Sequence, residues 1–102
     1  MDMDNTLAVK LPVMDVPARA CMELKKLTGL PLGEVKRRAA ADEFLYVCDY
    51  VDGGGLKLIN KIKREMRGYG IVVRLYEDGE ERTSELFDNI ERLHDEIDRE
   101  HW

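Results

Sequence analysis

Three side chains near the end of the chain have a spacing that suits metal ligands. If residues 83–100 form a helix, His94, Asp98 and His101 lie within about 60° of one another on its wheel, and imidazole and carboxylate groups are ordinary zinc ligands. The sequence offers no evident fourth ligand, and His101 stands where helices fray. His94 is also not followed by a second histidine four residues later, as in zinc proteases. We therefore expect packed or solvated histidines, no metal and no cofactor.

Other catalytic patterns are incomplete as well. Gly53, Gly54 and Gly55 precede a helical pattern and could present backbone N–H groups to an anion, but the Gly-Lys-Ser/Thr ending of a phosphate loop is missing. The two cysteines, Cys21 and Cys48, have no histidine near them in sequence, although the sequence does not show what lies near them in space. We expect small buried thiols, no catalytic residues and no enzyme.

The elements that would position these residues follow from hydrophobic periodicity and turn residues. Gly29 can end a helix in the left-handed conformation, and Pro31 suits the first turn of the next helix. Asp52 can cap a third helix, and Asp78-Gly79 is a turn pair. Together with the apolar periods, these signals predict strands at 7–13, 44–51 and 71–76 and helices at 17–28, 32–41, 55–67 and 83–100.

The order of these elements predicts a mixed α+β fold. It is β-α-α-β-α-β, a three-stranded sheet with helices packed on at least one face, followed by an additional acidic helix. A chain of 102 residues supports one modest core, so we expect a single domain over 1–102, with a C-terminal helical extension at 80–102. In helix 17–28 we expect Asp15 as the cap and Ala18, Cys21, Met22 and Leu24 facing inward.

Residues 7–76 resemble the C-terminal domain of the bacterial ribosomal stalk protein, a fold that the Clp protease adaptor is thought to share. The resemblance lies in the order of elements and in the corner Thr28-Gly29-Leu30, which is followed by Leu32, Glu34, Val35 and Lys36. Further along, Lys61–Arg67, Gly70 and Ile71–Arg74 match the family's basic helix, glycine and last strand.

The resemblance implies a docking surface on the first two helices. Stalk proteins recruit translation factors through exposed basic and apolar residues there, and Lys25 and Lys36 fall on positions that look equivalent to two of those basic residues. Met22 takes the place of another basic residue, and Lys26 replaces a glycine. Because the family's dimerising domain and hinge do not occur in this sequence, we expect the fold of the family rather than a working stalk protein.

Charge is distributed unevenly along the chain. Residues 1–70 hold 12 Lys or Arg against 10 Asp or Glu, whereas residues 71–102 hold 4 against 11, within a net charge of −5. The acidic end could attract a basic partner or fold back on the basic body. The candidate acidic surface comprises Glu77, Asp78, Glu80, Glu81, Asp88, Glu91, Asp95 and Asp98.

The last predicted helix carries a narrow apolar seam. Leu86, Ile90, Leu93 and Ile97 recur at 4-3-4 spacing, which is typical of one helix face. Two arrangements would bury this seam. The helix can fold over the free face of the sheet in a monomer, or it can pair with a second copy in a homodimer.

These surfaces lead to a protein-binding function as the first hypothesis. A small acidic inhibitor or immunity-type protein would use the acidic surface to steer a basic partner and the 44–51 strand to pack against it. The alternative is translation-factor binding or protease-adaptor activity through Met22, Lys25 and Lys36.

RNA binding by the basic helices is a further alternative. We expect no nucleic acid, because the chain is acidic and no aromatic residue lies among the helical basic residues. No apolar stretch is long enough for a membrane span, and two cysteines without a disulfide pattern favour a cytoplasmic protein.

Overall fold

A computed structural model gives the fold of residues 6–100, and it describes their side chains except those of residues 94 and 97–100. The elements run in the order β1 (Thr6–Lys10), α1 (Ala18–Thr28), α2 (Leu32–Ala40), β2 (Phe44–Asp49), α3 (Gly53–Arg67), β3 (Arg74–Glu77), β4 (Glu80–Arg82) and α4 (Ser84–Glu100). The predicted α+β class and the four helices are confirmed. None of the helices in the described part of the chain is both long and apolar enough to cross a bilayer.

The sheet has four antiparallel strands in the order β2-β1-β3-β4, whereas the sequence predicted three. The additional strand β4 follows directly from the Asp78-Gly79 turn, where both residues have positive φ, 53° and 82°. Two such residues give the turn a twist that suits a two-residue hairpin. The pair that was predicted to close the last strand therefore starts another one.

The predicted strand at 71–76 is partly wrong in position. Ile71 and Val73 are buried in the core, but regular pairing begins only at Arg74. Similarly, the strand predicted to reach Val51 ends at Asp49, and Val13 lies beyond β1 on the surface.

Helices α1, α2 and α3 begin and end at residues with clear local causes. Gly29 has φ 79° and its N–H donates to the carbonyl of Lys25 at 2.8 Å, which ends α1 as predicted. Asp52 accepts a hydrogen bond from the Gly55 N–H at 2.9 Å and caps α3. Asp15 does not cap α1, because the helix begins after Pro17 without a side-chain cap.

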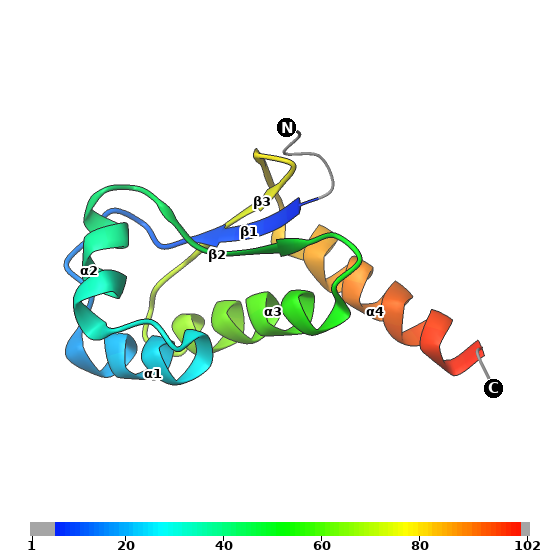
Figure 1. The fold of residues 1–102 in the computed structure, drawn as a ribbon, viewed down its shortest axis with the longest axis horizontal. Helices are drawn as coiled ribbons and strands as arrows, with labels where there is room; N and C mark the ends of the chain where they lie inside the picture. Colours follow the sequence, from blue (N-terminus) through cyan, green and yellow to red (C-terminus); the bar gives the residue numbers. More distant parts are fainter. Residues whose placement is uncertain (1–5, 101–102) are drawn as a thin grey trace.

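The core lies between one face of the sheet and the helices, with α3 running along that face (Figure 1). Leu7 and Val9 of β1 and Leu75 of β3 meet Leu56, Ile59, Ile62 and Met66 of α3 in one buried cluster. In α1 the buried residues are Ala20, Cys21 and Leu24, so the inward placement of Ala18 and Met22 was wrong; both are exposed.

Helix α4 packs along α3 instead of over the free face of the sheet. Phe87 is fully buried and Ile90 nearly so, while Leu86 is half-buried and Leu93 is 52% exposed. The prediction of the seam was therefore wrong in its centre: the buried face of α4 is centred on Phe87, which the predicted seam did not include. Ile97 lies outside the described side chains, and Figure 1 shows the far half of α4 projecting away from the body.

Candidate functional site: two charged helix surfaces

The acidic surface predicted from the sequence is largely paired within the chain. Asp88 contacts Lys63 at 2.6 Å, and Asp95 contacts Lys57 at 2.8 Å. Glu91 accepts a hydrogen bond from the Asn60 amide at 2.7 Å and lies 3.8 Å from Lys57. Asp98 lies outside the described side chains. The acidic face of α4 is thus turned towards the basic face of α3.

The acidic residues of the β3–β4 hairpin have partners as well. Glu77 and Glu80 pair with Arg82 at 3.2 and 3.1 Å, and Glu81 pairs with Arg74 at 3.4 Å. The Asp78 carboxylate accepts the backbone N–H of Thr6 at 2.9 Å. Every described member of the predicted acidic surface therefore has an intramolecular partner.

The α3–α4 contact includes a buried polar network. Asn60 is fully buried and donates to the carbonyl of Phe87 at 3.2 Å as well as to Glu91, while its own Oδ1 has no partner among the described residues. The Lys63 side chain is only 7% exposed, and its ammonium group also donates to the carbonyl of Ser84 at 3.4 Å. Since a buried charge without a partner is costly, Asp88 is needed to hold Lys63 in place.

In the described part of the chain, no acidic helix packs against α1 and α2 in the way that α4 packs against α3. Their two ranges hold six basic and two acidic residues, a net charge of +4, whereas α3 at +4 faces α4 at −5. In α2, Glu34 pairs with Arg37 and Arg38 at 2.6 and 2.7 Å, and Glu43 also pairs with Arg37. Among the described residues, no ion pair involves Lys25, Lys26 or Lys36.

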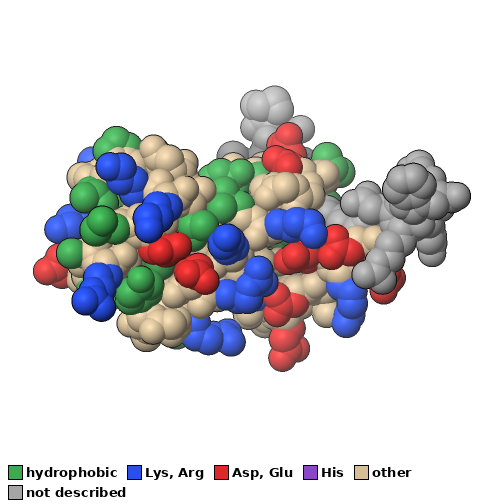
Figure 2. All heavy atoms as spheres, turned by 90° about the horizontal axis from the view of Figure 1, so that it is seen from below, with side chains coloured by type: hydrophobic (Ala, Val, Ile, Leu, Met, Phe, Trp, Pro, Cys, Tyr) green, Lys and Arg blue, Asp and Glu red, His purple; other side chains and the backbone are tan. Residues whose placement is uncertain are grey.

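These lysines lie beside exposed apolar side chains. Met22 is 55% exposed, Leu32 is 39% exposed, and Val13 lies on an open hollow that Lys36 also lines. Figure 2 shows hydrophobic side chains interspersed with Lys and Arg at the end of the molecule formed by α1 and α2. We define the α1–α2 surface by these six residues: Val13, Met22, Lys25, Lys26, Leu32 and Lys36.

Hydrogen bonding sets the ionisation of Glu34, one of the two carboxylates on α1 and α2. The Arg37 and Arg38 guanidinium groups donate to Glu34 and lower its pKa to about 2. Glu34 is therefore charged throughout the physiological range and offsets part of the arginine charge of α2. The positive charges of Lys25, Lys26 and Lys36 have no carboxylate in a described ion pair.

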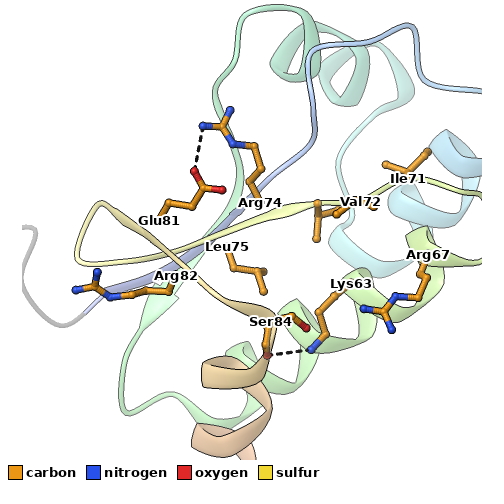
Figure 3. Close-up of a pocket in the computed structure, with 10 residues that line it drawn as sticks. Lys63, Arg67, Ile71, Val72, Arg74, Leu75, Glu81, Arg82 and Ser84 are labelled. Carbon is orange, nitrogen blue, oxygen red and sulfur yellow. Dashed lines mark hydrogen bonds and ion pairs between the residues drawn. The ribbon is translucent and has the colours of Figure 1, made fainter.

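A small cavity lies between the β3–β4 hairpin and the adjoining ends of α3 and α4 (Figure 3). Its volume is about 150 Å³, and Lys63, Arg67, Arg74 and Arg82 are among the residues that line it. Lys63 is held by Asp88, Arg74 by Glu81, and Arg82 points away from the cavity towards its own carboxylate partners. The cavity is therefore cationic in composition but mostly neutralised.

The structure also brings together a cluster that sequence reasoning missed. The Phe44 and Tyr76 rings meet edge to face with centroids 5.2 Å apart, and the Lys10 ammonium lies 5.1 Å from each ring. Arg74 lies 5.7 Å from Tyr76. These residues come from three strands, so no local spacing could reveal them. Asp42, at 3.6 Å from both Lys10 and Arg74, balances part of their charge, and Tyr76 is buried.

The described side chains give little support for chemistry. Burial raises the pKa of the Cys48 thiol to about 11 and also raises the pKa of Cys21, so both thiols are protonated at neutral pH and poorly nucleophilic. No group of three His, Cys, Asp or Glu side chains in the described part of the chain is placed to hold a metal ion. His94, Asp98 and His101 lie outside the described side chains.

Comparisons with protein-family models, curated proteins and solved structures find no match to this chain. The resemblance to the stalk-protein domain therefore stays a prediction from the sequence.

Proposed function

We propose that this chain is a non-catalytic, cytoplasmic protein-binding module, and that its α1–α2 surface docks an acidic, amphipathic segment of a partner protein. One observation carries the proposal. The described residues of the predicted acidic surface on α4 and the hairpin have partners inside the chain, while Lys25, Lys26 and Lys36 have no described ion pair and stand beside exposed apolar side chains.

The chemistry of the surface selects the partner. Exposed Met22, Leu32 and Val13 provide apolar area, and Met adapts its shape to different ligands. The surrounding lysines favour a segment that carries Asp or Glu next to its apolar anchors. A factor or protease subunit with such a segment would fit the family resemblance.

The inhibitor-type alternative needs an additional step. A basic partner that used Asp88, Glu91 and Asp95 would have to replace Lys63, Asn60 and Lys57, and removing Asp88 would leave Lys63 buried without its counter-ion. The hairpin acids are less constrained, because their pairs are exposed and such pairs contribute little.

Charge reversal with affinity capture separates these possibilities. The tagged chain would be compared with Lys25→Glu/Lys36→Glu and with a matched control, Lys61→Glu/Arg64→Glu, which changes net charge equally at exposed sites of α3. We expect a retained acidic partner to be lost only from the first variant. Loss from both variants, or loss only when Asp88, Glu91 and Asp95 are neutralised, would contradict the proposal.

A further inference from the structure

The two edges of the sheet differ in their capacity to pair with another chain. The β4 edge consists of Glu80, Glu81 and Arg82, which are all exposed and charged. The β2 edge is twice as long, 6 residues against 3, and contains no Lys, Arg, Pro or Gly. Proteins block unpaired edges with short strands and charges, so β4 is blocked and β2 is not.

Part of the β2 edge already takes hydrogen bonds from outside the sheet. The strand has an irregular register near its start, and there the Arg38 guanidinium donates to the carbonyls of Leu45 and Phe44 at 3.1 and 3.5 Å. From Tyr46 to Cys48 the described backbone pairing is with β1 alone. Backbone groups of an edge strand point alternately to its partner and outward, so Tyr46 and Cys48 bond to Val9 and Leu7 while Val47 faces the open edge, where a neighbouring strand could satisfy it.

Side chains at this edge suit an added strand. Val47 is 45% exposed, on the face of the sheet that it shares with Ala8 and Tyr76. It would contact an apolar side chain of a neighbouring strand, since directly opposed residues in antiparallel strands share a face.

Charge at the ends of the strand selects the occupant. Residues 42–52 hold four acidic and no basic residues. At the start of β2, Asp42 and Glu43 are paired with Lys10 and Arg37, but at its end Asp49 is exposed and has no described ion pair. A second copy added antiparallel would bring its own Asp42 and Glu43 towards Asp49, which is repulsive.

We propose that β2 is a second docking site, where an extended segment of another protein adds as a fifth, antiparallel strand. Because the amino-terminal end of that strand would lie next to Asp49, the segment carries Lys or Arg ahead of alternating apolar residues. This is β-strand addition, in which main-chain hydrogen bonds supply affinity and side chains supply selectivity. The site lies on different elements from the α1–α2 surface and does not depend on the function proposed for that surface.

The test uses a short blocked peptide in which lysines precede alternating valines and threonines. It is titrated into the isotope-labelled full chain while amide chemical shifts and hydrogen exchange are recorded. We expect saturable shifts from Tyr46 to Cys48 and slowed exchange at Val47, whose N–H faces the open edge. Three control peptides carry the lysines after the apolar residues, glutamates in place of the lysines, or N-methyl groups that remove the backbone donors.

Each control should bind at least about threefold more weakly, because it loses either the charge contact or the main-chain hydrogen bonds. Asp49→Lys and Val47→Lys should weaken binding by a similar factor. Val72→Lys is the matched control, since Val72 is exposed and lies outside β2, and it should leave binding unchanged. Lys25→Glu/Lys36→Glu should also leave it unchanged, which separates this site from the α1–α2 surface.

Three results would overturn the proposal. One is the absence of peptide-dependent shifts at Tyr46–Cys48 in a chain whose spectrum shows it to be folded. Another is equal binding of the N-methylated peptide. The third is a concentration-dependent dimer in sedimentation that Val47→Lys abolishes, since it would make a second copy the occupant.

Discussion

The two helix pairs of this molecule use charge in opposite ways. In α3–α4 a basic helix faces an acidic one, and Lys63 and Asn60 are buried in the contact. In α1–α2 both helices are basic, and Lys25 and Lys36 face solvent beside exposed apolar side chains. Net charge is therefore a poor guide to a binding surface in this chain, because the described acids of the predicted acidic surface have partners within the fold, whereas Lys25, Lys26 and Lys36 have no described ion pair.

The largest loss of stability should come from a substitution in the apolar centre of the α3–α4 contact. Phe87→Ala removes a fully buried ring from the core and should lower the free energy of unfolding by about 3–5 kcal/mol. Met22→Ala, at an exposed position of α1, should change it by less than about 0.5 kcal/mol. Denaturant unfolding measures both, and similar losses for the two variants would remove the distinction between the helix pairs.

A smaller effect is expected from the ion pair of α3–α4. Asp88→Ala leaves Lys63 buried without its counter-ion and should cost about 1–3 kcal/mol, less than a fully buried pair because Asp88 itself is exposed. Adding Lys63→Met should restore most of the lost stability. If the double variant were as unstable as the sum of the two single variants, the pair would not be coupled.

Reversing charge on α1–α2 should leave the fold almost unchanged. Lys25→Glu/Lys36→Glu alters exposed residues without described ion pairs, so the free energy of unfolding should shift by less than about 0.5 kcal/mol. The measurement is again denaturant unfolding. A loss as large as that of Asp88→Ala would mean that these lysines serve the fold as Lys63 does.

The smallest expected effect concerns α2, where Glu34 pairs with Arg37 and Arg38 but not with Lys36. Arg37 and Arg38 lower the pKa of Glu34 to about 2, so its stabilising contribution is complete above pH 4.5, the ordinary value, and is lost as the pH falls towards 2. Carboxyl NMR titration of Glu34 should show this midpoint, and Arg38→Ala should raise it. A midpoint near 4.5 in the unaltered chain would contradict the observed pairing.

The sequence predicted several ends of helices from local signals. Gly29 with φ 79° and the Asp52 cap were both recognisable from residue type and position. Strand β4 was missed because Glu80-Glu81-Arg82 has no apolar alternation, and its pairing depends on the turn before it and on β3 beside it. Such a strand is defined by its neighbours and not by its own residues.

The pairing of the acidic surface depends on tertiary packing, although the sequence contains both of the faces that meet. Lys57, Asn60 and Lys63 recur every three residues and so share a face of α3, and Asp88, Glu91 and Asp95 recur similarly on α4. Whether these faces meet is decided by where Phe87 is buried. The 4-3-4 spacing of Leu86, Ile90, Leu93 and Ile97 predicted a buried face that does not include Phe87.

The most direct test of the central claim is selection from a charge-unbiased random peptide library on the immobilised chain. Enriched peptides would be counter-selected on Lys25→Glu/Lys36→Glu and, separately, on Lys61→Glu/Arg64→Glu. We predict a class of acidic peptides with spaced apolar residues that is lost on the first variant and kept on the second. Peptides that bind at the β2 edge are set aside by counter-selection on Val47→Lys. If the remaining peptides were basic, bound Lys25→Glu/Lys36→Glu as well as the unaltered chain and required Asp88 or Asp95, the α1–α2 surface would not be the docking site.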